Sequence, residues 1–209
     1  MSVPDERKLI VRSGYDELAP RFAAWAEAIE DDPWERYLGE LSARLDDGAR
    51  VLDLGCGNGS KTKRPAERFQ VVGVDASAEQ LRLARAAVPE ASFVEADFGS
   101  LELDDATFDA VTAFYSVSHV PREEHEALFA TIARWLRPGG LFLASLGASG
   151  SGDWTGDWLG VEMFFSSHDA DTNRRLLTGL GFELLLDEVV TIREPEGDAT
   201  FLWVLARKP

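Results

Sequence analysis

The stretch VLDLGCGNG, Val51 to Gly59, decides the fold. A short apolar run leads directly into a turn in which three glycines each stand two residues from the next. Glycine lets the backbone turn tightly and lets a ligand approach where a Cβ atom would block it. A purely structural turn explains the same residues, so the pattern predicts a buried strand and leaves the ligand open.

A second apolar stretch, VVGVD, favours a ligand-binding role for the glycine turn. It ends at Asp75, about twenty residues after the glycine turn, where an acidic side chain can accept hydrogen bonds from ribose hydroxyls. A solvated aspartate at a strand end is the alternative. The two stretches together favour a nucleotide-type cofactor site more strongly than either does alone.

Short aliphatic segments alternate with amphipathic segments along the chain, which is typical of an α/β domain with a largely parallel sheet. We expect seven strands, at 50–54, 70–74, 92–95, 108–113, 141–146, 183–191 and 200–207. Helices are expected at 78–87, 123–136 and 169–180, and Pro138, Gly139 and Gly140 are expected to end the second of these.

The two ends of this pattern carry weaker signals. Pro4 to Leu45 is typical of two or three helices, interrupted at Gly14 and at the turn Asp31 to Pro33, and we expect a helical cap over 1–46. Gly147 to Gly160 has no helical period, and loops of this length are often lids, so 147–168 is expected to be a lid. The whole chain, 1–209, is expected to be a single domain.

Composition excludes several classes of function. The formal net charge of −16 would repel a phosphate backbone, so a nucleic-acid partner is not expected. Cys56, the single cysteine, cannot form an intramolecular disulfide, and the chain starts with MSVPDERK, which lacks the apolar region of a signal peptide. These features predict a cytoplasmic protein with no membrane span. Cysteine and histidine are too few and scattered for a metal site.

Five stretches in order, VLDLGCGNG, VVGVDAS, FVEADF, FDAVTAFYS and LRPGGLFLAS, resemble the motifs of the class I S-adenosylmethionine-dependent methyltransferases. The resemblance covers most of residues 50 to 146. It implies a Rossmann-like, doubly wound, seven-stranded sheet whose last strand is antiparallel. It also implies S-adenosylmethionine as cofactor, S-adenosylhomocysteine as product, and methyl transfer to an O, N, S or C atom of a small molecule.

The resemblance assigns roles around the glycine turn. Tyr15 lies in YDELAPRFAAW, which looks like the amino-terminal helix that closes over the cofactor in small-molecule members. Asp53 would brace the turn through hydrogen bonds to the backbone or to the cofactor amine. Gly55, Cys56 and Gly57 would line the methionine moiety.

Further along, the resemblance assigns the nucleoside contacts. Asp75 would hold the ribose hydroxyls, and Ala76 would flank the adenine. Asp97 would accept a hydrogen bond from the exocyclic amine, and Phe98 would donate the adjacent backbone NH or pack on the ring. Phe114 would contact the methionine amine through its backbone.

Two departures from the family pattern are visible. The segment after the glycine turn reads SKTKRPAERF, where Pro65 suits a first helical turn better than an interior, so that helix is expected to start late or to be distorted. Nucleic-acid amino-methyltransferases carry Asn/Asp-Pro-Pro-Tyr where this chain has Phe114 to Val117. A DNA adenine or protein glutamine acceptor therefore loses support.

Three residues are candidates for catalysis: His119, His168 and Tyr115. His119 follows the fourth strand, where open α/β sheets place ligands, so it is predicted to be a base or substrate orienter, with a helix cap before Pro121 as the alternative. His168 stands at a predicted helix N-terminus, where capping competes with catalysis. His125, within a predicted amphipathic helix, is interpreted as a surface residue.

Several questions stay open in the sequence. Trp154, Trp158, Met163, Phe164 and Phe165 fit either an aromatic wall for the acceptor or ordinary core. One rival function is a nicotinamide-dependent oxidoreductase, disfavoured because the glycine spacing differs from the dinucleotide fingerprint. Another is a protein that binds the cofactor without transferring a methyl group. A monomer and a homodimer fit equally well.

Overall fold

The computed structural model describes residues 5–209. Its main sheet has seven strands: β1 (Arg50–Leu54), β2 (Gln70–Asp75), β3 (Ser92–Glu95), β4 (Phe108–Ala113), β5 (Leu136–Gly147), β8 (Glu183–Glu194) and β9 (Gly197–Arg207). A separate two-stranded sheet consists of β6 (Ser149–Trp158) and β7 (Val161–Asp169). The helices are α1 (Glu6–Glu27), α2 (Trp34–Ser42), α3 (Lys63–Ala66), α4 (Ala78–Ala87), α5 (His125–Trp135) and α6 (Ala170–Gly179), with 3-10 turns η1 (Val117–His119) and η2 (Arg122–Glu124).

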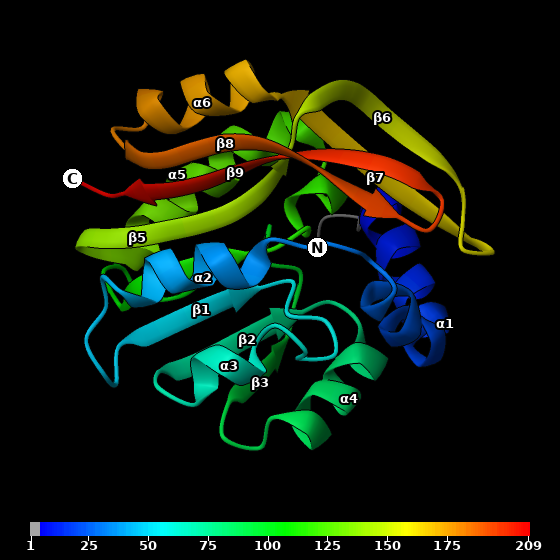
Figure 1. Cartoon of the computed structure of the whole chain (residues 1–209), viewed down its shortest axis with the longest axis horizontal. Coiled ribbons are helices and arrows are strands. Elements are labelled where there is room, and N and C mark those ends of the chain that lie inside the picture. Colours follow the sequence, from blue (N-terminus) through cyan, green and yellow to red (C-terminus); the bar gives the residue numbers. More distant parts are fainter. Residues whose placement is uncertain (1–4) are drawn as a thin grey trace.

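The strand order is β3-β2-β1-β4-β5-β9-β8 (Figure 1). The five strands from β3 to β5 are parallel, and β9 runs antiparallel to both β5 and β8. The predicted doubly wound sheet with an antiparallel last strand is therefore confirmed. The carboxyl ends of β1, β2 and β4 lie along one edge of this sheet, which is where open α/β sheets bind ligands.

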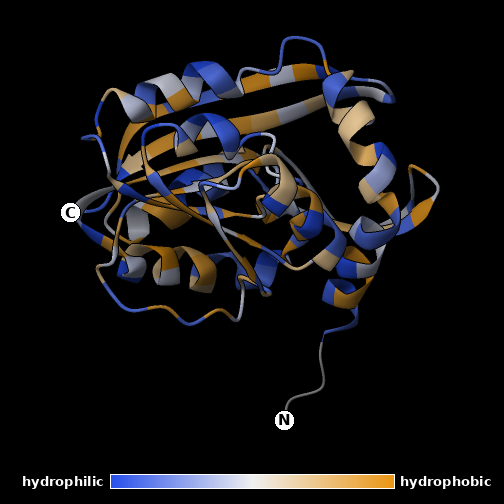
Figure 2. Ribbon diagram, turned by 90° about the horizontal axis from the view of Figure 1, so that it is seen from below, coloured by the Kyte–Doolittle hydropathy of each residue, from blue (hydrophilic) through white to orange (hydrophobic). Residues whose placement is uncertain are grey.

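Buried side chains cover both faces of the sheet. On one face, Phe129, Ile132 and Trp135 of α5 and Leu177 of α6 pack against the central strands. On the other face, Tyr37, Leu38 and Leu41 of α2 pack against β5 and β9. Figure 2 shows hydrophobic residues concentrated on the central strands between these helices. Helices on both faces fix the sheet and leave its carboxyl edge free for a site.

Helix α1 runs without a break through Gly14, contrary to the interruption expected there. A Cβ atom at Gly14 would stand 2.7 Å from Met163 Cε and 3.0 Å from the Glu162 carbonyl oxygen, both on β7. Glycine therefore allows close packing of α1 on β7, rather than ending the helix. The expected break at Asp31 to Pro33 is present, and Pro4 lies outside the described residues.

The segment after β5 forms a hairpin, where the sequence predicted a loop. Trp158 pairs with Val161, so Leu159 and Gly160 form a two-residue turn in which both have positive φ, 55° and 82°. This is the type I′ geometry that matches strand twist, but leucine lacks the Asn-Gly or Asp-Gly signal that announces it. In Figure 1 this hairpin lies beside α1.

Other boundaries differ by less. The strand predicted at 141–146 begins at Leu136, directly after α5, and Pro138 to Gly140 lie in its irregular start, where the β4 pairing shifts register. The helix after the glycine turn is limited to α3, which contains Pro65, as the sequence predicted. No helix within residues 5–209 is both long and apolar enough to cross a membrane.

Candidate active site

A cavity of about 530 Å³ opens at the carboxyl edge of the sheet. Its lining comes from the ends of β1, β2 and β4, from α1, and from the two hairpins β6–β7 and β8–β9. This size lies within the range typical of small-ligand sites. Most of the residues predicted to contact the cofactor line it, namely Tyr15, Asp53, Gly55, Cys56, Gly57, Asp75, Ala76, Phe98 and Phe114.

The buried carboxylate of Asp53 braces the glycine turn. It accepts hydrogen bonds from the hydroxyl of Thr62, at 2.7 Å, and from that of Thr112 on β4, at 2.8 Å. Burial raises the pKa of Asp53, and the two hydroxyl donors oppose that rise. Asp53 thus fixes the loop between β1 and α3 against β4 through threonine hydroxyls. The expected bond to the backbone is not among these contacts, and the alternative bond to the cofactor amine stays a prediction.

The Asp75 carboxylate joins the glycine turn to the chain segment that follows β2. One oxygen accepts from the backbone N–H of Gly57 at 2.9 Å, and the other accepts from the N–H of Ser77 at 2.9 Å. Burial raises the pKa of Asp75, opposed by these N–H donors. Since a carboxylate has about four acceptor positions, Asp75 can still receive hydrogen bonds from a ligand in the cavity.

Tyr15 and His119 form a hydrogen-bonded pair in the cavity wall. The imidazole contacts the Phe164 carbonyl oxygen through Nδ1 at 2.9 Å, and contacts the Tyr15 hydroxyl through Nε2 at 2.8 Å. Because a carbonyl can only accept, Nδ1 carries the proton and Nε2 accepts from Tyr15. Neither contact caps the helix after Pro121, so the capping alternative for His119 is wrong. The pair instead links α1 to β7.

His119 should make folding sensitive to mild acid. Burial lowers its pKa to about 4, whereas an unfolded histidine titrates near 6.5. The unfolded chain therefore binds the extra proton between these values, so the stabilisation is complete above pH 6.5 and is lost as pH falls towards 4. We expect His119→Asn to flatten the dependence of the unfolding free energy on pH by up to about 1.4 kcal/mol per pH unit.

Urea denaturation at pH 7, 6 and 5 would measure this difference between the wild type and the variant. His125, whose pKa burial also lowers, acts in the same direction but is present in both proteins. Equal slopes would show that His119 titrates normally in the folded chain.

Tyr115 joins the end of β4 to the loop between α1 and α2. Its φ of 58° is unusual for a residue other than glycine. Its N–H donates to the Ser145 hydroxyl at 2.7 Å, and its own hydroxyl donates to Asp32 at 2.6 Å. Asp32 also forms an ion pair with Lys61 at 2.6 Å. Tyr115 lines the cavity while its hydroxyl is engaged by a carboxylate.

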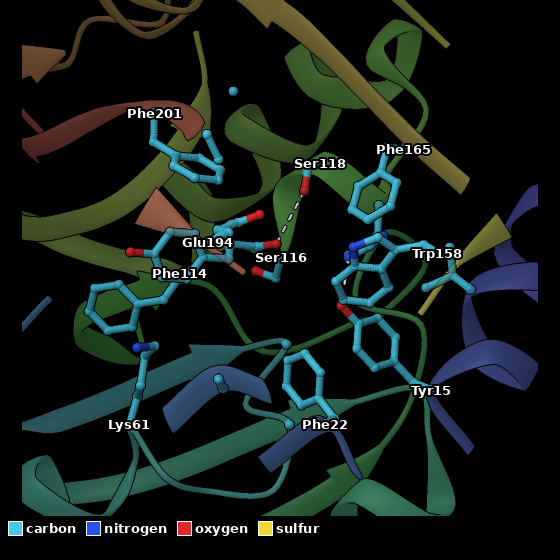
Figure 3. Close-up of a pocket in the computed structure, with 18 of the residues that line it drawn as sticks. Tyr15, Phe22, Lys61, Phe114, Ser116, Ser118, Trp158, Phe165, Glu194 and Phe201 are labelled. Atoms are coloured by element: carbon cyan, nitrogen blue, oxygen red, sulfur yellow. Dashed lines mark hydrogen bonds between the residues drawn. The ribbon is translucent and has the colours of Figure 1, made fainter. Parts of the chain in front are cut away.

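Aromatic side chains form one wall of the cavity. Phe22 and Trp25 of α1 meet Trp158 of β6 with ring centroids 6.2 and 5.1 Å apart, and Trp158 lies 5.4 Å from Phe165. Figure 3 shows Tyr15, Trp158 and Phe165 gathered on this side. The sequence left five residues between an acceptor wall and ordinary core. Trp158 and Phe165 line the cavity, whereas Met163 and Phe164 are buried in the core. The fifth, Trp154, is 45% exposed.

Three residues discussed in the sequence analysis, His168, Asp97 and His125, do not line the cavity. His168 Nε2 contacts the Arg122 carbonyl oxygen at 3.1 Å, outside the cavity lining, and the residue that caps α6 is Asp169. Asp97 accepts from the Gly99 N–H at 2.9 Å and pairs with Lys8, so its side chain is also absent from the lining. His125 is buried, not on the surface, because its Nε2 bonds to the Val120 carbonyl at 2.9 Å.

Several lining residues were not predicted: Asp32, Lys61, Ser118, Glu194 and Phe201. Asp32 and Lys61 stand in loops whose composition carries only a turn signal. Glu194 and Phe201 come from the β8–β9 hairpin, which the bridge between Arg193 and Glu30 joins to the loop after α1. No local pattern in the sequence announces such long-range packing.

Residues 51–140 match the model of a methyltransferase domain family. This part of the chain has the sequence of a methyltransferase domain. The chain is 41% identical over 115 residues to a trans-aconitate 2-methyltransferase of Azoarcus sp., an alignment that covers 53% of the chain and 44% of that protein. It is 32% identical over 155 residues to a demethylmenaquinone methyltransferase of Symbiobacterium thermophilum, covering 67% of the chain and 60% of that protein. The chain thus spans about half the length of the curated relatives that it matches.

Among solved structures, the Burkholderia thailandensis 1,6-didemethyltoxoflavin-N1-methyltransferase is similar to this chain with a TM-score of 0.74 and 23% sequence identity. The match covers 100% of this chain and 91% of that one, whose structure holds 1,6-didemethyltoxoflavin and S-adenosylhomocysteine. At this identity the likeness shows the fold alone. It extends the resemblance beyond residues 51–140 to both terminal regions.

Proposed function

We propose that this chain binds S-adenosylmethionine and transfers its methyl group to a small-molecule acceptor. The observation that carries the proposal is the Asp75 carboxylate, which accepts from the glycine turn and lines an aromatic-walled cavity at the carboxyl edge of the sheet. The family match and the curated relatives, all of them methyltransferases, support it.

The residues present fit the cofactor. A Cβ atom at Gly57 would meet nothing closer than Gln80 Oε1 at 4.0 Å, so the space above this glycine is open to a ligand. Asp75 would hold the ribose, Phe98 would pack near the base, and the turn at Gly55 to Gly57 would take the methionine moiety. Asp97 would reach the adenine only if its contacts with Gly99 and Lys8 gave way, so we assign it no role.

When bound, the cofactor supplies an activated methyl group on a sulfonium centre. The task left to the protein is to hold the acceptor in line with that group and to exclude water, which is a proximity effect. Helix α1 and the β6–β7 hairpin cover the cavity, and Tyr15 and His119 join them. We therefore propose that 1–46 is a cap and 147–168 a lid of one domain, with residues 1–4 outside the described structure.

Asp75→Ala should weaken binding of S-adenosylhomocysteine by about 1.5 to 3 kcal/mol, because a charge-assisted hydrogen bond to the ribose is lost. Calorimetry measures the dissociation constant, and thermal melting checks that the variant is folded. Asp109→Ala is the matched control, since Asp109 stands at the start of β4, at the opposite end of the strand from the cavity, where it accepts from the Arg50 N–H. An unchanged constant in folded Asp75→Ala would place the ribose elsewhere.

Release of S-adenosylhomocysteine with candidate acceptors tests the transfer itself. Binding without release would favour a protein that holds the cofactor but transfers no methyl group.

Three further proposals follow from the sequence: the acceptor is not a nucleic acid, given the net charge of −16; the protein is cytoplasmic, given its single cysteine; and it is a monomer or a homodimer.

A further inference from the structure

Glu194, the last residue of β8, lines the cavity with a carboxyl group that has no partner in residues 5–209. Within residues 5–209 its carboxyl oxygens form no hydrogen bond and no ion pair, whereas its neighbours Arg193 and Glu196 pair with Asp198 and with Trp25. In Figure 3 Glu194 is drawn among the side chains that line the cavity, together with Phe114, Ser116 and Phe201. An acidic group in such a place lacks a counter-charge.

The other carboxyl groups of the lining are engaged. Asp53 accepts from the Thr62 hydroxyl and Asp75 from the Gly57 N–H. Asp32 pairs with Lys61, and Asp198 pairs with Arg193 at 3.6 Å. Among residues 5–209, Lys61 is the only Lys or Arg that lines the cavity, and Asp32 already holds it at 2.6 Å. No protein cation in the cavity is therefore free to neutralise Glu194.

The backbone holds Glu194 over the cavity. Arg193 forms a bridge with Glu30, which brings the hairpin tip onto the loop after α1. On the same tip, Glu196 accepts from the indole N–H of Trp25 at 2.7 Å. The position of Glu194 is thus fixed from both sides, and its carboxyl group is presented to a ligand without a large rearrangement.

Glu194 belongs to the acceptor side of the cavity. In the strand order, β2 with Asp75 lies near one edge of the sheet, whereas β8 forms the opposite edge. Around Glu194 the walls are aromatic, with Tyr115 and Phe201 in edge contact at 4.8 Å between ring centroids. Aromatic faces attract cations, so the acid and the rings favour the same kind of ligand.

We propose that Glu194 determines acceptor specificity by pairing with a positively charged nitrogen, so that the acceptor is a small, partly apolar amine. This inference rests on the proposed function. The aromatic walls take the apolar body of the amine, and Glu194 supplies the counter-charge that the cavity lacks. The neutral analogue would leave the carboxylate unpaired, which is unfavourable in a partly buried site.

The test compares matched pairs of probes on protein saturated with S-adenosylhomocysteine: phenethylamine against 2-phenylethanol, and tryptamine against tryptophol. Ligand-observed NMR titration gives each dissociation constant at pH 8. We expect the amine of at least one pair to bind about tenfold more tightly than its alcohol, as a charge-assisted contact provides. Glu194→Gln, which keeps shape and removes charge, should abolish that preference.

Glu183→Gln is the matched control, because it removes one negative charge from the opposite end of the same strand, where Glu183 pairs with Arg207. It should keep the preference. Equal binding of amine and alcohol in every pair, absence of binding in both pairs, or a preference that survives Glu194→Gln overturns the proposal. A loss of S-adenosylhomocysteine affinity in Glu194→Gln with the amine preference intact would also overturn it, by moving Glu194 to the cofactor.

A second measurement needs no variant. Burial raises the pKa of Glu194 to about 7, helped by Glu196 and Asp32, while the amines stay protonated. The titratable groups that act on Glu194, or on which Glu194 acts, are Glu196, Asp32 with its partner Lys61, Tyr15 and Tyr115. The amine preference should therefore grow several-fold from pH 6 to pH 8, and a preference independent of pH would contradict the assignment. Failure of the proposed function itself would appear separately, as absence of S-adenosylhomocysteine binding to the wild type.

Discussion

Gly57→Val should abolish binding of S-adenosylhomocysteine, weakening it by at least about 100-fold, while the chain stays folded. A Cβ atom at position 57 would meet no protein atom closer than Gln80 Oε1, at 4.0 Å, so the first atom of the new side chain fits the folded backbone. Gly57 itself lines the cavity in which we place the cofactor. The valine would fill it, so steric exclusion and not unfolding removes binding.

Thermal melting with and without S-adenosylhomocysteine measures the effect, because a ligand that binds the folded state raises the melting temperature. Gly139→Val is a matched control. Gly139 also has a positive φ, 77° against 53° for Gly57, and also has room for a side chain, but it lies at the start of β5, far from the cavity lining. The control suffers similar backbone strain and should keep the ligand-induced rise. A rise retained in Gly57→Val would show that the turn does not touch the cofactor.

The sequence predicted the parallel part of the sheet closely, because its signals are local. The glycine turn after β1 and the acidic end of β2 are patterns in which neighbouring residues specify the backbone conformation themselves. Three of the predicted strands, 50–54, 92–95 and 108–113, have the observed bounds. Asp53, Gly57 and Asp75 lie together for the same reason: parallel strands end at one edge.

The acceptor side was not predictable in this way. The β6–β7 hairpin turns at Leu159 and Gly160, where the first residue gives no turn signal, and Gly14 serves close packing between elements far apart in the chain. Glu194 enters the cavity because Arg193 bridges to Glu30, a contact that only the tertiary structure specifies. The cofactor side is thus encoded by local motifs, and the acceptor side by packing.

His119→Ala should lower turnover by about 100-fold while the affinity for S-adenosylhomocysteine changes little. We propose that His119 is a positioning residue that acts through Tyr15. Its Nδ1 proton is held by the Phe164 carbonyl, and its Nε2 lone pair is occupied by the Tyr15 hydroxyl. With a pKa of about 4 it is a weak base near pH 7, where a general base works best with a pKa close to the working pH.

Tyr15→Phe separates positioning from direct base catalysis. If His119 acts through the Tyr15 hydroxyl, Tyr15→Phe should reduce the turnover number as much as His119→Ala does, and the double variant should be no slower than either single one. If His119 itself takes a proton from the acceptor, Tyr15→Phe frees Nε2 and turnover should stay or rise. Steady-state kinetics gives kcat and KM for each variant, and calorimetry gives cofactor affinity. A purely structural histidine would lower the melting temperature with nearly normal kcat per folded molecule, which would leave proximity within the cavity as the main source of rate.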